Sequence, residues 1–147
     1  RLVLPVVWRF RTDPKDRGVQ ERWPRMVDFS AKPWQDIRVD DFWTNQGIRH
    51  HGAAWYTTTF TVPGTVKENL WLLFDMLDGA AEIWIDGRLA GKTPAAPWDK
   101  AKAIDITKRV KAGGEHQLVM RVVKKSFAAG IKGRVRLMES LRIVGDR

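Results

Sequence analysis

The chain of 147 residues contains no cysteine. This absence excludes a disulfide framework, a thiolate metal site and a cysteine nucleophile, although it does not determine the compartment. The chain also has no apolar run close to the ~20 residues that a membrane-spanning helix needs, so we expect no membrane span. No signal peptide is visible and the first residue is Arg1, so we expect either that a leader has been removed or that the chain is part of a longer protein.

Acidic residues are scarce relative to basic ones, with 17 Asp and Glu against 26 Lys and Arg, and the net charge is +9. A domain this basic attracts polyanions, and nucleic acid, anionic lipid and acidic polysaccharide are all candidates. The alternative is that the charge serves only solubility. Because hydrophobic residues make up 44% of the chain, we expect a folded domain rather than a disordered one.

Long helical patterns are missing as well, and short strand patterns separated by turn residues take their place. The longest strand is expected over residues 52–63, GAAWYTTTFTVP, where Tyr56 and Phe60 lie on an apolar side and threonines lie mostly on the other. Further strands are expected over residues 3–10, 35–39, 69–77, 80–85, 88–91, 104–107, 116–124 and 134–144, with short helical turns within 21–29 and at 108–111. Asp86-Gly87 predicts a type I′ hairpin turn. About eight antiparallel strands without a long helix predict an all-β sandwich.

Four motifs follow one another along the chain: the longest strand with the residues before it, a hairpin, a proline-containing segment and a late strand. They consist of Trp43, Gly47, Gly52, Ala54, Trp55, Tyr56, Phe60, Val62 and Pro63, then residues 78–91, then Pro97, Trp98 and residues 104–107, and finally residues 113–118. In this order they resemble the N-terminal sugar-binding domain of family 2 glycoside hydrolases. The similarity covers residues 8–137, and four ordered motifs are more specific than any one of them.

This resemblance implies that residues 1–147 form a single galactose-binding-like β-jelly roll that is not catalytic. The catalytic carboxylates of such enzymes lie in a separate barrel domain, to which nothing in this chain corresponds. The catalytic domain of a parent enzyme is therefore an expected partner. The family's Asn-Gly turn is here Asp86-Gly87, which also suits a type I′ turn.

Sugars present apolar faces that stack on aromatic rings and hydroxyls that bond to polar side chains. We therefore place a candidate carbohydrate site in the loop before the longest strand, joined by a second loop at residues 126–133 at one end of the sandwich. The candidate residues are Trp43, Asn45, Gln46, Arg49, His50 and His51 in the first loop, and Phe127 and Lys132 in the second. Trp43 has a second interpretation, as a packing residue, and each polar candidate taken singly is also consistent with a solvated loop. Trp98 is expected to pack under its proline-containing loop, whereas Trp23 and Trp34 are candidates for exposed platforms.

The residues do not support catalysis by this chain alone. Glycoside hydrolysis needs two carboxylates about 5–10 Å apart, whereas most acids here occur at turns, and the adjacent Asp40 and Asp41 point apart on an extended chain. The three histidines lack the spacing of a metal site. We predict no catalytic residue and no cofactor. Jelly rolls of this type sometimes hold a structural calcium ion, whose ligands the sequence does not locate.

Three functions remain open. The one we favour is a non-catalytic carbohydrate-binding module of a larger carbohydrate-active enzyme, which binds polysaccharide or oligosaccharide and, because of its charge, prefers acidic glycans. The second is a purely structural domain that packs on a catalytic barrel and binds no sugar by itself. The third is a nucleic-acid-binding domain, which we disfavour because the basic residues are spread over nearly every strand. A secreted module of this kind is expected in an extracellular or periplasmic location.

Overall fold

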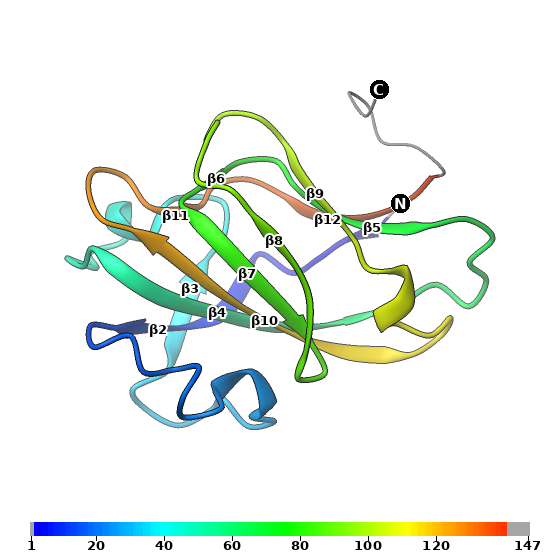
Figure 1. The fold of residues 1–147 in the computed structure, drawn as a ribbon, viewed down its shortest axis with the longest axis horizontal. Coiled ribbons are helices and arrows are strands. Elements are labelled where there is room, and N and C mark those ends of the chain that lie inside the picture. The colour runs from blue at the N-terminus through cyan, green and yellow to red at the C-terminus, as the bar shows by residue number, and fades with distance from the viewer. Residues whose placement is uncertain (1, 141–147) are drawn as a thin grey trace.

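The computed structural model describes residues 2–140 of the chain. Its strands pair in antiparallel fashion and form two main sheets that face each other across an apolar interior. Figure 1 shows these sheets as two layers, with a segment from the first part of the chain as a third layer below the larger sheet. The fold is an all-β sandwich, as the sequence predicts.

The larger sheet contains six strands in the order β3-β2-β4-β10-β7-β8. They are β2 (Val7–Asp13), β3 (Gln35–Arg38), β4 (Gly52–Thr61), β7 (Ala80–Ile85), β8 (Arg88–Thr93) and β10 (Glu115–Lys124). The central strands β4 and β10 pair along their whole length, from Glu115 opposite Thr61 to Lys124 opposite Gly52. This long ladder fixes which side chains face the core, because a shift of one residue would reverse all of them.

The smaller sheet contains four strands in the order β1-β12-β5-β9, and β6 and β11 form a separate pair. These strands are β1 (Leu2–Val3), β5 (Leu70–Phe74), β6 (Leu77–Asp78), β9 (Lys102–Asp105), β11 (Gly130–Ile131) and β12 (Val135–Glu139). Three short 3-10 turns complete the described chain, η1 (Trp23–Arg25), η2 (Trp43–Asn45) and η3 (Thr107–Arg109). Within residues 2–140 there is no α-helix.

The main core lies between the two sheets and follows the strand alternation. Tyr56 and Phe60 of β4 and Met120 of β10 point inward and are buried. Tyr56 packs edge-on against Phe10 with 5.0 Å between ring centroids, and its hydroxyl accepts the backbone N–H of Ile131 at 3.1 Å. Burial raises the pKa of Tyr56, so this hydroxyl stays protonated and structural.

Residues 14–34, between β2 and β3, cover part of the outer face of the larger sheet, and we name them the covering segment (Figure 1). Its Trp23, Phe29 and Trp34 pack on Trp55 and Val119 of the sheet. Trp23 lies edge-on to Trp34 at 5.6 Å and to Trp55 at 5.5 Å. The sheet therefore has an apolar core on both faces, and Trp23 and Trp34 are buried rather than exposed platforms.

The buried carboxylate of Asp13 fixes the start of the covering segment. Its Oδ1 accepts the backbone N–H of Arg17 at 2.9 Å, and its Oδ2 accepts the N–H groups of Gly18 and of the Trp55 indole, both at 2.9 Å. Gly18 lies so close to Trp55 that a Cβ atom would come within 2.5 Å of the ring. Three charge-assisted hydrogen bonds offset the cost of burying this carboxylate.

An ion pair at the surface also joins the covering segment to the sheet. Arg121 of β10 donates to both carboxylate oxygens of Asp16, at 2.9 and 2.6 Å, and to Glu82 at 2.8 Å. The hydrogen bonds from Arg121 hold the pKa of Asp16 below its ordinary value of 3.8.

We expect Asp16→Asn to lower the free energy of unfolding at pH 7 by at most about 1 kcal/mol, because the pair is partly exposed. A carboxylate whose pKa is lowered by folding stabilises the protein above its unfolded-state pKa and loses that contribution as the pH falls through its folded-state pKa. The difference in the free energy of unfolding between wild type and variant should therefore stay constant from neutral pH to about pH 5. It should disappear as the pH falls below 3.8. Urea unfolding across this range measures it, and an undiminished difference well below pH 3.8 would contradict the assignment.

Most of the expected strands occur where the sequence places them. The first strand over residues 3–10 is divided, and β2 begins after Pro5, as a ring without an N–H group requires. Asp86 and Gly87 have φ values of 51° and 81°, as a type I′ turn requires. Residues 141–144, expected to extend the last strand, lie outside the described residues.

Candidate functional site

Three candidate residues of the loop before β4 hold that loop together. Trp43 is fully buried, and its indole N–H donates to the carbonyl of His50 at 2.9 Å. The Gln46 amide accepts the backbone N–H of Arg38 at 3.0 Å and donates to its carbonyl at 2.8 Å. His50 is bonded through Nε2 to the carbonyl of Ala53 at 2.7 Å. The packing interpretation of Trp43 is therefore correct, because its buried ring has no face left for a sugar.

The other candidates of this loop meet the second loop at one end of the sandwich. Asn45, Arg49, His51 and Phe127 line a hollow of about 470 Å³ together with Thr44, Ile48 and Ala128. His51 joins the two loops directly, since its Nε2 is bonded to the carbonyl of Phe127 at 2.8 Å. Arg49 is exposed, and its guanidinium has no hydrogen bond or ion pair with any residue from 2 to 140. The hollow thus combines an aromatic ring with a free cation and polar side chains.

Phe127 is the most unusual residue of this hollow. Its side chain is 85% exposed, and its backbone has a left-handed φ of 62°. Such a backbone costs about 1–2 kcal/mol for a residue with a side chain. Lys124 anchors this loop to β6, because its ammonium donates to Asp78 at 2.7 Å and to the carbonyl of Ala128 at 2.9 Å. A strained and exposed aromatic residue on a fixed loop is typical of a binding surface.

Lys132, the last candidate, does not line this hollow. Its ammonium nitrogen lies 5.4 Å from the ring centroid of Phe42, and Trp98 contacts the same ring at 6.4 Å between centroids. Trp98 is 49% exposed, so the prediction that it packs under its loop is wrong. The sequence did not reveal the exposure of Trp98, because the proline-containing loop around it has no period that separates buried from exposed positions.

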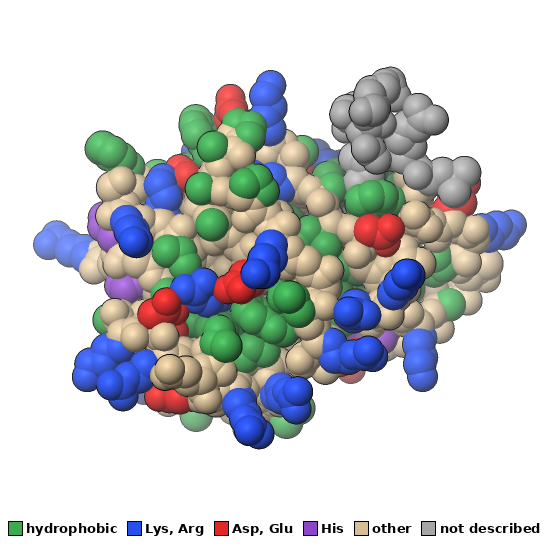
Figure 2. Space-filling model, viewed as in Figure 1, with side chains coloured by type: hydrophobic (Ala, Val, Ile, Leu, Met, Phe, Trp, Pro, Cys, Tyr) green, Lys and Arg blue, Asp and Glu red, His purple; other side chains and the backbone are tan. Residues whose placement is uncertain are grey.

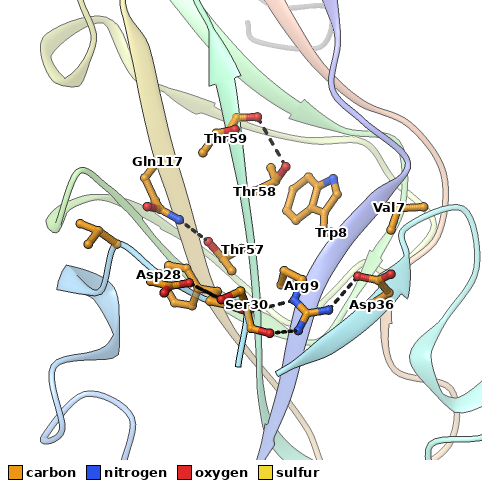
Figure 3. Close-up of a pocket in the computed structure, with 12 residues that line it drawn as sticks. Val7, Trp8, Arg9, Asp28, Ser30, Asp36, Thr57, Thr58, Thr59 and Gln117 are labelled. Atoms are coloured by element: carbon orange, nitrogen blue, oxygen red, sulfur yellow. Dashed lines mark hydrogen bonds and ion pairs between the residues drawn. The ribbon is translucent and has the colours of Figure 1, made fainter. Parts of the chain in front are cut away.

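An open groove of about 510 Å³ crosses the outer face of the larger sheet beside the covering segment (Figure 3). Its floor includes Thr57 and Gln117, which are joined by a 3.0 Å hydrogen bond from the Gln117 amide. Arg9 forms part of its wall, but its guanidinium donates to Asp36 and to the carbonyls of Phe29, Ser30 and Trp34. These polar groups mainly hold the covering segment on the sheet, and the sequence predicted none of them as site residues.

A buried histidine also contacts a carboxylate, but the arrangement is structural. His116 Nδ1 lies 2.6 Å from Asp86 Oδ2, and the backbone N–H of Lys111 donates to His116 Nε2 at 3.0 Å. Because Nε2 accepts that bond, Nδ1 carries the proton and donates it to Asp86. No lone pair remains on the ring for general-base catalysis, so the pair only ties the β7–β8 turn to the start of β10.

Other kinds of site find little support in the part of the chain that is described. No group of three or more metal-ligating side chains is arranged there to hold an ion, and no helix there is long and apolar enough to cross a membrane. Figure 2 shows Lys and Arg side chains scattered over the visible face rather than gathered in one stripe. A continuous track for a nucleic-acid backbone is not seen on this face.

Comparison with known proteins identifies the architecture. No protein-family profile matches the chain. A β-glucuronidase of Paenibacillus borealis is 29% identical over 93 residues, which cover 57% of this chain and 15% of that protein. The structure of a β-glucuronidase from Ruminococcus gnavus in complex with D-glucuronic acid matches with a TM-score of 0.77 and 17% identity, covering 92% of this chain and 28% of that chain. The chain has the fold of one domain of a β-glucuronidase.

The R. gnavus β-glucuronidase in complex with D-glucaro 1,5-lactone gives the same TM-score of 0.77 and the same coverage. The chain spans less than a third of the length of these β-glucuronidases, so the likeness concerns one of their domains. The resemblance to a domain of a glycoside hydrolase, expected from the four ordered motifs, is confirmed.

Proposed function

We propose that this chain is a non-catalytic carbohydrate-binding domain of a larger carbohydrate-active enzyme of the family 2 glycoside hydrolase type. The observation that carries the proposal is the hollow at the end of the sandwich, where the exposed ring of Phe127 stands beside Arg49, Asn45 and His51. An aromatic face with a rim of hydrogen-bonding groups is the arrangement that binds a sugar ring.

The chemistry of the two adjacent acids, Asp40 and Asp41, agrees with a non-catalytic role. Asp40 is paired with Arg38 at 2.6 Å. Asp41 accepts the backbone N–H of Phe42 at 2.8 Å and the side-chain amide of Asn45 at 2.9 Å. Carboxylates used in this way stabilise the loop and are not set on either side of a cleft, as glycoside hydrolysis requires. We place the catalytic carboxylates in another domain of the parent enzyme, as the resemblance to family 2 glycoside hydrolases implies.

We expect Phe127→Ala to weaken polysaccharide binding about tenfold, because the substitution removes the stacking surface. Affinity electrophoresis in gels that contain neutral or acidic polysaccharides measures this change. The melting temperature should stay the same, since the ring is 85% exposed and buries little surface. Val19→Ala is the matched control, because Val19 is 51% exposed on the covering segment and lines neither the hollow nor the groove. Equal retardation of the Phe127 variant and the wild type would refute the site.

A second function is favoured by a separate observation. Leu2, Val3, Val6 and Val7 are each exposed by 40% or more, and they lie at β1, at the start of β2 and in the bend just before it. Several exposed apolar side chains within one short stretch of chain are typical of a surface that another domain covers. If no polysaccharide retards the unaltered protein, the carbohydrate proposal fails and a purely structural domain that packs on a catalytic barrel takes its place.

A further inference from the structure

We propose that Trp98, Phe42 and Lys132 form a subsite for a glycan that contains uronic acid units, that is, sugar units that carry a carboxylate. This inference rests on the proposed carbohydrate-binding function. It adds the charge of the preferred ligand and a place where that charge is recognised, which lies outside the hollow around Phe127.

Trp98 has the properties of a stacking platform. It is the only one of the eight tryptophans with a largely exposed side chain, and all eight lie within residues 2–140. The loop that carries it is fixed by the buried Lys102, whose ammonium donates to the carbonyls of Leu77 at 2.8 Å, Pro94 at 3.0 Å and Ala95 at 3.4 Å. An indole on a fixed loop loses little conformational freedom when a ligand stacks on it.

Phe42 connects the platform to the cation. It is only 6% exposed, and it lies next to Trp43, whose ring is part of the main core. Trp98 meets Phe42 with 6.4 Å between centroids and an interplanar angle of 62°, and the ammonium of Lys132 lies 5.4 Å from the same centroid. The Trp98 ring and the Lys132 ammonium are therefore within about 12 Å of each other, which places both within reach of neighbouring sugar units on one glycan chain.

The charge of Lys132 is not neutralised by the rest of the described chain. Lys132 is half-buried, and its ammonium forms no ion pair or hydrogen bond with any residue in the 2–140 range. Asp75, which packs against the neighbouring Gly133, is occupied by Arg134 at 3.1 Å and Arg136 at 2.8 Å. Asp99 and Lys100, which follow Trp98, cancel in charge. An ammonium without a counter-charge beside aromatic rings attracts an anion. Lys acts there as a compact charge and does not impose the bidentate hydrogen-bonding geometry of Arg.

A glycan that contains uronic acid units matches this pair of features. The apolar face of one sugar unit stacks on the indole, and the carboxylate of a neighbouring uronic acid unit accepts a charge-assisted hydrogen bond from the ammonium. A neutral sugar obtains the stacking contact alone. Two separate residues therefore contribute to the binding affinity of the subsite. Trp98 supplies the stacking contribution, and Lys132 supplies the contribution from charge.

The test compares polymers that differ only in the charge of the carboxylate. Polygalacturonate, alginate and hyaluronan are each used beside their methyl esters, and dissociation constants are obtained by affinity electrophoresis at fixed ionic strength. We expect the unaltered protein to bind at least one acid polymer more tightly than its ester. Lys132→Gln should weaken binding of that acid polymer about fivefold and leave the ester unchanged. Trp98→Ala should weaken binding of both forms about tenfold.

Lys125→Gln is the matched control, because Lys125 is an exposed lysine whose charge has no partner in residues 2–140. If Lys125→Gln and Lys132→Gln reduce the acid preference equally, the net charge causes it and the subsite is refuted. If no polymer binds the unaltered protein, the proposed function and the subsite both fail. If Phe127→Ala abolishes binding while Lys132→Gln keeps the full acid preference, the proposed function stands and only the subsite is overturned. Unchanged melting temperatures show that each variant is folded.

Discussion

Trp43→Ala is expected to lower the free energy of unfolding by about 3–5 kcal/mol, because truncating a buried aromatic side chain leaves a cavity that the core fills only in part. The Trp43 ring is fully buried and contacts the rings of Phe10 at 5.5 Å and Tyr56 at 6.4 Å. The substitution also leaves the carbonyl of His50 without its 2.9 Å hydrogen bond from the indole. Urea unfolding at neutral pH measures the change.

This loss is a large share of the stability of an ordinary domain, which is about 5–15 kcal/mol. Trp43→Phe keeps most of the ring volume but removes the indole N–H, so its cost should be smaller and should reflect mainly the hydrogen bond to His50. A Trp43→Ala variant that unfolds like the wild type would contradict the buried position. Such a result would return Trp43 to the list of candidate sugar-stacking residues.

Asp13→Asn is expected to destabilise the protein by about 2–4 kcal/mol and to loosen the covering segment. The Asp13 carboxylate accepts three N–H groups, and Oδ2 alone serves both Gly18 and the indole of Trp55. An asparagine side chain has a single acceptor oxygen, so its NH₂ group faces at least one donor that it cannot satisfy. The buried N–H group that loses its partner then carries the full cost of its desolvation.

Urea unfolding followed by intrinsic fluorescence measures this change, since Trp55 and Trp23 report the environment of the covering segment. Asp28→Asn is the matched control, because Asp28 is an exposed acid of the same segment and bonds only to Ser30. We expect the control to unfold like the wild type. Equal effects of the two substitutions would show that loss of negative charge, rather than the buried hydrogen bonds, changes the stability.

The sandwich was predictable because its strands carry a clear period of two. Tyr56 and Phe60 alternate with threonines along β4, and Asp86-Gly87 supplies turn chemistry that few other dipeptides match. What the alternation could not reveal is the second core. Trp55 was expected to be buried and is, but it points away from the main core, and the covering segment that buries it has no periodic pattern.

The sequence predicted only part of the grouping of residues at the candidate site, because loop side chains have no periodic pattern. Asn45, Arg49, His51 and Phe127 were expected near each other, and the structure brings them to one hollow. Whether a loop side chain faces water or bonds to its own backbone depends on three-dimensional contacts between distant segments. Gln46 has the composition of a binding residue, yet its amide is used by Arg38, eight residues away in sequence.

The packing of the covering segment has an optical consequence. Trp34, Trp23, Trp55 and Trp84 form a chain of neighbours whose ring centroids are 5.6, 5.5 and 5.5 Å apart in turn. Indoles this close share their electronic transitions, and such coupling produces a paired signal in circular dichroism. Trp34 and Trp23 belong to the covering segment and Trp55 and Trp84 to the sheet, so the part of the signal that comes from the Trp23–Trp55 pair depends on contact between the layers. This part of the indole signal thus reports whether the covering segment is docked on the sheet, in a spectral feature separate from that of the strand backbone.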